Sequence, residues 1–432
     1  MDPAIITLCV LAVAAFLFVT ELIPLAVTAM AACTALGILG VLPSKQVYAG
    51  LSNSTVVLFG GMFVIGAAMF KTGLAEAIGI AVVKKAGTNQ VPLMAAIMLV
   101  TIALSAVSSN TGTVACLMPV IIGICQAAKI SQSRQLMPLA IAANVGGTIT
   151  MIGTPPNVIV TGALTAAGLP TFGFFEFAYI GIPLSIIIVL YTLFIGRHFV
   201  PDKQAGAMDE EAVKAAAEEA GASGDSAPKS KTKMWISGII LLGVVACMAL
   251  GLKNLPLHTA AVTGAILCVI TGCLKEKEAY AGIDWVTIFL FAGMIPLASA
   301  MNTSGAGKLI AEYTVAALGG NPSPYVITAV LFILAVVLTQ FMSNTASKAL
   351  LCPVGIALAA QVGASPRAVL MAILIASSCA FASPVGTPPN TLVLGPGKYS
   401  FMDFVKCGTG LVVICLVVSI AVIPVVWPFF PN

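Results

Sequence analysis

Charge is the property that this sequence has least of. Only 8% of its 432 residues are Asp, Glu, Lys or Arg, whereas 59% are hydrophobic, and the mean hydropathy is +1.07. A soluble domain carries about 25% charged residues, because its surface faces water. The composition therefore excludes a soluble enzyme, a nucleic-acid-binding protein and a disordered chain. It predicts a polytopic helical membrane protein.

Metal-binding patterns are missing as well. The 11 cysteines are scattered without a Cys-x-x-Cys pair, and the two histidines, His198 and His258, stand at the ends of apolar runs. Such spacing is typical of cysteines that pack as small apolar side chains. The apolar runs contain no Ser/His, paired-acid or metal-ligand constellation. We therefore expect neither an enzyme nor a cofactor, and no nucleic-acid partner.

Acidic side chains avoid the centres of the apolar runs. Glu21 falls in a short turn, and Glu176 and Asp284 stand near the ends of runs. Proton-coupled carriers usually place an acidic residue or a histidine within the membrane. The absence of such residues favours an anionic substrate, and a coupling ion held by neutral oxygens fits Na⁺ better than H⁺.

Apolar runs long enough to cross a bilayer recur along the chain. A spanning helix needs about 20 apolar residues. Two less regular apolar regions, 91–167 and 323–395, are interrupted by Gly, Pro, Ser, Asn and Thr. The clear candidates are residues 4–20, 23–42, 55–70, 177–197, 235–252, 256–274, 286–302 and 406–427.

The chain contains an internal repeat with an offset of 232 to 234 residues. Five sequence blocks recur in the same order, which indicates a duplicated fold. Residues 1–200 form the first copy and residues 234–432 the second, and the linker 201–233 holds 12 of the 36 charges. The blocks are Pro24-Leu25 with Pro256-Leu257, Val47–Gly50 with Ala279–Gly282, Leu58–Met62 with Leu290–Met294, Ser109–Thr111 with Ser343–Thr345, and Gly153–Asn157 with Gly386–Asn390.

The basic residues indicate how the chain is oriented. If each copy has five transmembrane helices plus one re-entrant hairpin, the odd number of spans inverts the second copy relative to the first. With both termini outside, fifteen Lys and Arg residues lie on the cytoplasmic side and four, Lys45, Lys253, Lys308 and Arg367, lie outside. This bias matches the positive-inside rule. We expect an inverted-topology repeat in the inner (plasma) membrane, with the linker 201–233 in the cytoplasm.

Two pairs of polar motifs interrupt the apolar regions. Gly153–Asn157 and Gly386–Asn390 each contain two consecutive prolines, which remove amide donors and break a helix. Each break exposes a helix N-terminus suited to an anion and free carbonyls suited to a cation. Irregular backbone at membrane depth must be buried in protein or line a wet cavity. We expect broken helices over about 135–167 and 367–395, and hairpins with Ser-Asn-Thr tips over about 91–128 and 323–361.

The doubled Ser-Asn-Thr and Thr-Pro motifs resemble those of the divalent anion/sodium symporter (DASS) family of di- and tricarboxylate and sulfate transporters, over essentially the whole chain. The resemblance implies Na⁺-coupled symport of a C4-dicarboxylate such as succinate, malate or fumarate. It also implies an elevator-type mechanism in a homodimer, in which a transport domain slides against a scaffold. Citrate or sulfate are alternative substrates, and cation-independent dicarboxylate exchange is the alternative mechanism.

The same resemblance implies which residues bind the substrate and Na⁺. Ser109, Asn110, Thr111, Ser343, Asn344 and Thr345 would bind the carboxylates, and Thr154, Pro155, Thr387 and Pro388 would complete the pocket. One Na⁺ would be held by Ser105, Ser109, Asn110 and the carbonyl of Gly153. A second would be held by Thr339, Asn344 and the carbonyls of Met342 and Gly386. These groups are also the oxygen-bearing or helix-end groups nearest to the two breaks.

Lys348 departs from the family pattern. It stands one turn past Asn344, where the family usually has a small or hydroxylated residue, and its counterpart in the first copy is Val114. A buried ammonium is costly unless it is paired. Three interpretations are open: a countercharge in the substrate site, a substitute for a sodium ion, or a side chain that extends to an aqueous cavity.

Overall fold

The computed structural model describes residues 2–87, 89–154, 156–203, 230–252, 254–320 and 322–430, with the backbone alone at 83–86. Within these ranges every regular element is an α-helix or a short 3₁₀ helix (η). The first half contains α1 (Pro3–Thr20), α2 (Leu25–Ile38), α3 (Ser44–Val47), η1 (Ala49–Ser52), α4 (Ser54–Lys71), α5 (Leu74–Ala86), α6 (Gln90–Ser105), α7 (Asn110–Ala128), α8 (Ser133–Gly146), α9 (Asn157–Ala166), α10 (Ala178–Phe194) and η2 (Gly196–His198). The second contains α12 (Lys231–Leu250), α13 (Leu257–Ile270), α14 (Glu276–Ala281), α15 (Trp285–Thr303), α16 (Ala306–Ala317), α17 (Pro324–Phe341), α18 (Asn344–Gln361), α19 (Pro366–Ser378), η3 (Ala380–Ala382), α20 (Pro388–Leu394) and α21 (Phe401–Val426).

Several of these helices are long and apolar enough to cross a membrane. In the described part of the chain, α1, α4, α7, α12, α15, α17 and α21 are long and apolar enough to cross a bilayer, and shorter apolar helices accompany them. The predicted all-α polytopic membrane fold is thereby confirmed. The inverted orientation of the two copies and the re-entrance of the hairpins stay predictions.

Helices of one half of the chain pack against helices of the other half. Helix α2 packs against α15 and α4 packs against α13, so the second and third long helices of each half contact those of the other half. Glycines allow the close approach: a Cβ at Gly61 would lie 2.6 Å from the carbonyl carbon of Ala261, and one at Gly293 would lie 2.5 Å from that of Ala29. These four residues are two repeat-related pairs, as an approximate two-fold arrangement requires.

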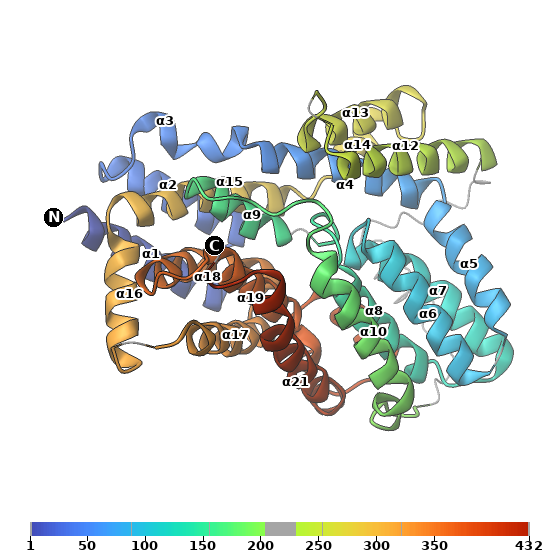
Figure 1. Cartoon of the computed structure of the whole chain (residues 1–432). Coiled ribbons are helices and arrows are strands. Elements are labelled where there is room, and N and C mark those ends of the chain that lie inside the picture. Colours follow the sequence, from blue (N-terminus) through green and yellow to red (C-terminus); the bar gives the residue numbers. More distant parts are fainter. Residues whose placement is uncertain are drawn as a thin grey trace.

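The helices form groups that meet along an apolar seam. Figure 1 shows α4, α12, α13 and α14 together along one edge of the molecule, and α6, α7, α8 and α10 gathered in another region. A small apolar cavity lies among α4, α15, α9 and α18, which also contact one another, and its walls include Val56, Phe291, Ile295, Val158 and Cys352. These walls offer few hydrogen-bonding groups, so this cavity does not suit a dianion.

Serine caps determine where two central helices begin. Ser109 precedes α7 and its Oγ accepts a hydrogen bond from the amide of Gly112 at 3.4 Å, and Ser343 precedes α18 and accepts one from the amide of Ala346 at 3.2 Å. Such caps satisfy amides that the first helical turn leaves free. The Ser-Asn-Thr motifs therefore join α6 to α7 and α17 to α18.

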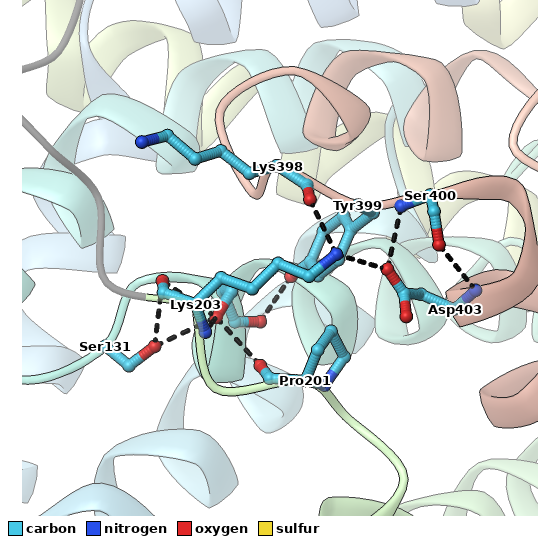
Figure 2. Close-up of polar contacts among 8 residues, drawn as sticks. Ser131, Pro201, Lys203, Lys398, Tyr399, Ser400 and Asp403 are labelled. Carbon is cyan, nitrogen blue, oxygen red and sulfur yellow. Dashed lines mark hydrogen bonds and ion pairs between the residues drawn. The ribbon is translucent and has the colours of Figure 1, made fainter.

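The described ends of the predicted linker are attached to the helices. Helix α12 begins at Lys231, and residues 204–229 lie outside the described ranges. At the other end, Lys203 Nζ donates to Asp403 Oδ2 at 2.6 Å and to the carbonyl of Lys398 at 2.9 Å (Figure 2). The chain that leaves the first half is thus held against the start of α21 in the second half.

Candidate functional site

The asparagine at the end of each Gly-Thr-Pro-Pro-Asn motif closes the helix break. Asn157 Nδ2 donates to the carbonyls of Gly147 and Thr150 at 2.8 and 3.0 Å. Asn390 Nδ2 donates in the same way to Ala380 and Ser383, at 2.6 and 2.8 Å. The chain between α8 and α9 leaves carbonyls without helical partners, and one amide side chain satisfies two of them. Both asparagines are buried, so their remaining Oδ1 atoms have fixed positions.

Oxygen atoms converge around Asn110, in what we call the first oxygen cluster: Ser105 Oγ, Asn110 Oδ1 and the carbonyls of Ala143 and Gly153. Ser105 Oγ lies 2.6 Å from the Asn110 side-chain amide and 2.8 Å from the Ala143 oxygen. The same end of that amide lies 2.9 Å from the Gly153 oxygen and 3.2 Å from the Ala143 oxygen. The turn after α6, the end of α8 and the helix break therefore meet at one point.

The second half builds an equivalent group, the second oxygen cluster: Thr339 Oγ1, Asn344 Oδ1 and the carbonyls of Ser377 and Gly386. Thr339 Oγ1 lies 2.6 Å from the Asn344 amide and 2.9 Å from the Ser377 oxygen. The amide in turn lies 3.1 Å from the Gly386 oxygen and 2.9 Å from the Ser377 oxygen. Ser105 and Thr339 are completely buried.

Each asparagine amide can satisfy its cluster in two ways. With Nδ2 directed inward, the two N–H groups of Asn110 and of Asn344 face three oxygens, and in each cluster one of these, the carbonyl of Ala143 or Ser377, also accepts from the Ser105 or Thr339 hydroxyl. With Oδ1 directed inward, four oxygens face one another without a proton between Oδ1 and the carbonyls, which is stable only if a cation binds among them. Neutral carbonyl, amide and hydroxyl oxygens at helix breaks are suitable ligands for Na⁺. The residues present therefore fit a sodium ion at either cluster.

The other predicted residues surround these clusters. Ser109 and Ser343 cap helices, and Thr111 and Thr345 are half-buried beside the two asparagines. Thr154 and Thr387 are buried next to the glycine carbonyls. Met342 is buried at the end of α17, and Pro388 is exposed at the start of α20. Pro155 lies outside the described residues.

Further contacts connect the two halves at these breaks. Asn144 Nδ2 donates to Asn390 Oδ1 at 3.0 Å, and Thr387 Oγ1 donates to Asn144 Oδ1 at 3.2 Å. On the other side, Lys348 Nζ donates to Asn157 Oδ1 at 3.2 Å and to Ser378 Oγ at 3.0 Å. Asn144 and Ser378 occupy equivalent positions of the repeat. Asn144 contacts Asn390 directly, whereas Ser378 is linked to Asn157 through Lys348.

The structure narrows the three interpretations of Lys348. The side chain is 0% exposed and its Nζ donates to two neutral oxygens. The interpretation that it extends to an aqueous cavity is therefore wrong in this conformation, because Asn157 and Ser378 hold the Lys348 amine inside the protein. The interpretations as a countercharge and as a substitute for a cation stay open.

Sequence reasoning missed several of these groups. The carbonyls of Ala143 and Ser377 leave no signal in the sequence, since any residue has a carbonyl. Asn157 and Asn390 did have a signal, because both end a repeated motif next to a proline pair that leaves carbonyls unpaired. The bridging role of Asn144 depends on contact between the two halves, which no local pattern shows.

Comparison with known proteins identifies the family. A family model described as citrate transporter (CitMHS) matches residues 15–363. The chain belongs to the citrate transporter family. It is 25% identical to the uncharacterized transporter YfbS of Escherichia coli K12, over 98% of this chain and 99% of that protein. It is 28% identical to the sodium-dependent dicarboxylate transporter SdcS of Staphylococcus saprophyticus, over 94% of this chain and 84% of that protein.

Solved transporter structures share the fold of this citrate transporter family member. The YdaH transporter of Alcanivorax borkumensis superposes with a TM-score of 0.63 at 15% identity, over 95% of this chain and 98% of that one. MtrF of Neisseria gonorrhoeae superposes with a TM-score of 0.61 at 16% identity, over 90% and 83%. The family and the relatives confirm the resemblance to the DASS family, and the protein is a secondary transporter rather than an enzyme.

Proposed function

We propose that this transporter carries a dianion of the C4-dicarboxylate class, such as succinate, malate or fumarate, together with Na⁺. The observation that carries the proposal is the pair of oxygen clusters, each located where one helix breaks and another begins. Among the described residues that hydrogen-bond within the clusters, none is acidic. The relatives named sodium-dependent dicarboxylate transporter SdcS support both the substrate class and the coupling ion.

The helix starts beside the clusters favour a carboxylate ligand. Helix α7 begins at Asn110 and α18 at Asn344, and a helix N-terminus carries a partial positive charge that attracts anions. The half-buried hydroxyls of Thr111 and Thr345 stand one residue further along and can donate to a carboxylate. The proposed substrate site comprises Ser109, Asn110, Thr111, Thr154, Pro155, Ser343, Asn344, Thr345, Lys348, Thr387 and Pro388.

The oxygen clusters provide the proposed coupling. A bound sodium ion supplies positive charge that offsets the dianion, and its binding requires Asn110 or Asn344 to present Oδ1 rather than Nδ2. Ser105 and Thr339 would then direct their protons away from the ion, toward other acceptors. Because the ligands of each cluster come from a Ser-Asn-Thr turn and a helix break, ion binding rigidifies the surface on which the substrate rests.

The apolar seam supports an elevator-type mechanism. Its cavity lies between α4 and α15 on one side and α9 and α18 on the other. Sliding along apolar walls breaks few hydrogen bonds. We place α6–α10 and α17–α21 in the transport domain and the remaining long helices in the scaffold, through which the chain would form a homodimer in the plasma membrane with both termini outside.

Two alternatives each have an observation in their favour. The buried Lys348 within the transport domain favours cation-independent exchange of dicarboxylates, because its amine, once protonated, would supply part of the counter-charge. The description of the matching family model favours citrate as the substrate.

Uptake of radiolabelled succinate into otherwise empty proteoliposomes tests the proposal. We expect an inward Na⁺ gradient to drive accumulation, and malate and fumarate to compete better than citrate or sulfate. Asn110→Ala should abolish Na⁺-dependent uptake in a folded protein. Ser185→Ala removes an equally buried hydroxyl that bonds only within α10 and should preserve uptake. Transport that requires internal substrate and ignores Na⁺ would instead establish the exchange alternative.

A further inference from the structure

The asparagine that closes each helix break is held by a different side chain in the two halves of the chain. In the second break, Asn390 Oδ1 accepts a hydrogen bond directly from Asn144 Nδ2 at 3.0 Å. In the first break, Asn157 Oδ1 accepts one from Lys348 Nζ at 3.2 Å. Asn157 and Asn390 occupy equivalent positions of the repeat. Two unlike donors therefore serve the same acceptor atom in the two breaks.

The second half lacks an asparagine at the position from which the first half donates. Ser378 occupies the repeat position of Asn144, and its hydroxyl donates to the carbonyl of Leu374 in its own helix at 3.0 Å. A serine hydroxyl has a single proton, so Ser378 cannot also donate to Asn157. Lys348 Nζ makes the connection instead, because it donates to Ser378 Oγ at 3.0 Å as well as to Asn157.

The position of the lysine shows the opposite exchange. Val114 occupies the equivalent position in α7 and is buried, and an apolar side chain suffices there because Asn144 already serves the other break. The pair Val114 and Asn144 thus corresponds to the pair Lys348 and Ser378. Lysine has two more side-chain heavy atoms than valine, and serine has two fewer than asparagine, so the exchange conserves size. The lysine amine, protonated or neutral, has an N–H group for each of its two acceptors.

Asn157 connects this bridge to the first oxygen cluster. Its Nδ2 donates to the carbonyls of Gly147 and Thr150. The Thr150 carbonyl also accepts from the amide of Gly153 at 3.3 Å, and the carbonyl of Gly153 belongs to the cluster. A Cβ at Gly147 would lie 2.6 Å from Asn110 Oδ1, so Gly147 forms a wall of the same cluster. A displacement of Asn157 would therefore move groups that shape the first cluster.

We propose that Lys348 is a positioning residue that fixes the first helix break by bridging Ser378 to Asn157, in place of an asparagine at position 378. Lys348 follows Asn344 of the second cluster in the sequence, yet the geometry that it fixes is that of the first cluster. The consequence for uptake rests on the proposed function, whereas the consequence for stability does not.

The main experiment gives the second half the residues of the first. Lys348→Val removes the donor to the buried Asn157 Oδ1, and it should lower the unfolding temperature and raise the KM for succinate at least about fivefold. Lys348→Val/Ser378→Asn recreates the pair that the first half uses and should recover most of both losses. Recovery of KM in a variant without the amine is a result that neither a countercharge nor a substitute for a cation would give.

Lys348→Val/Ser378→Leu is the matched control. Leucine has as many side-chain heavy atoms as asparagine but no N–H group, so this variant restores the volume without the donor. We expect it to recover little of the loss in KM. Equal recovery with leucine and with asparagine would mean that Lys348 only fills space, and would overturn the inference.

A double-mutant cycle tests the bridge without transport. In Asn157→Leu the acceptor is absent, so Lys348→Met should lower the unfolding temperature less in this background than in the wild type. Methionine keeps most of the length of lysine, so the comparison can be read even if Lys348→Val does not fold. Additive shifts in unfolding temperature would contradict a bond between the two side chains.

Other outcomes separate the bridge from the proposed function. Unchanged stability and KM in Lys348→Val would reject the bridge, and so would a loss that Ser378→Asn fails to recover in a folded protein. Wild-type uptake that ignores Na⁺ would instead reject the coupling in the proposed function, while the unfolding measurements would still decide whether Lys348 holds Asn157.

Discussion

Asn144 in α8 donates a hydrogen bond from Nδ2 to Oδ1 of Asn390, at the start of α20, with 3.0 Å between the two atoms. The two residues are 246 positions apart in the sequence. Asn390 is oriented by its own two bonds to backbone carbonyls, so the bond to Asn144 ties the first half of the chain to the helix break of the second. Thr387 Oγ1 also donates a hydrogen bond to the Asn144 side chain, at Oδ1.

Asn144→Ala should therefore weaken both stability and substrate binding. The substitution leaves the buried Asn390 Oδ1 without its donor and Thr387 Oγ1 without its acceptor, at a cost of about 1–3 kcal/mol in the free energy of unfolding. Because Thr387 belongs to the proposed substrate site, we expect a raised KM for succinate. Thermal unfolding and uptake kinetics measure the two effects, and Ser185→Ala, which should change neither, is the control. An unaltered KM would show that Thr387 does not depend on Asn144.

Gly61→Ala and Gly60→Ala should have opposite consequences although the residues are neighbours. A Cβ at Gly61 would lie 2.6 Å from the backbone of Ala261, whereas one at Gly60 would have no atom within 4 Å. We expect Gly61→Ala to separate α4 from α13 and to cost about 1–3 kcal/mol, and Gly60→Ala to be neutral or slightly stabilising. Thermal unfolding in detergent compares the two variants, and Gly293→Ala should reproduce the loss at the repeat-related contact. Equal stability of all three would contradict the close helix contacts.

Glu176→Gln should destabilise the end of the molecule where Glu176 pairs with Arg367. The carboxylate also accepts from Trp427 Nε1 at 2.6 Å and from the amide of Gly173 at 2.8 Å. Removal of its charge leaves a partly buried guanidinium without an anion, which should cost about 1–3 kcal/mol. Trp427 is 3% exposed, so a red shift of its fluorescence should accompany the loss of stability.

The matched control for this prediction is Glu312→Gln. Glu312 pairs with Lys308 at 3.7 Å on the surface of α16, where an exposed ion pair contributes about 0–1 kcal/mol. We expect no change in fluorescence and little change in unfolding temperature. If the two substitutions were equivalent, the contacts of Glu176 would contribute no more than a surface pair.

Asp403 should make stability depend on pH in the acidic range. Burial on its own raises the pKa of this carboxyl, but hydrogen bonds from Lys203 Nζ and the Ser400 amide outweigh it, so the pKa lies below its ordinary value. The carboxylate therefore stabilises the fold above the pKa of the unfolded chain, and this contribution is lost as the pH falls through the lowered pKa of the folded state.

Asp403→Asn tests this dependence. At neutral pH the variant should be less stable by about 0.5–1 kcal/mol, and the difference from the wild type should shrink as the pH falls below about 4. Thermal unfolding over a pH series measures the difference. Asp202→Asn, at the more exposed pair with Arg134, should show a smaller difference. If the difference in stability between the wild type and Asp403→Asn stayed constant with pH, the lowered pKa of Asp403 would be contradicted.

Several features of the site could be predicted because their chemistry is local. Consecutive prolines break a helix wherever they occur in an apolar run, so the interruptions before Asn157 and Asn390 were predictable from residue type alone. The Ser-Asn-Thr turns carry their own caps, Ser109 and Ser343. The pairing of Asn110 with Gly153 was implied by family resemblance, and the structure places these groups 2.9 Å apart.

Other features depend on which segments meet in space. The carbonyls of Ala143 and Ser377 belong to the clusters only because α8 and α19 end beside the two turns. The acceptors of Lys348 come from two different helices, α9 and α19. No spacing in the sequence relates Lys348 to Asn157, because a contact between two halves is decided by packing of the whole bundle.

The sequence by itself determined that this is a duplicated helical membrane protein with four polar interruptions. Residue composition and proline placement act on each segment independently of its neighbours. The tertiary structure alone decided that the interruptions form two oxygen clusters and that the second lies beside the buried Lys348. The physical reason is that hydrogen bonding and charge repulsion depend on distances of a few ångströms, which are established only when helices far apart in the chain pack together.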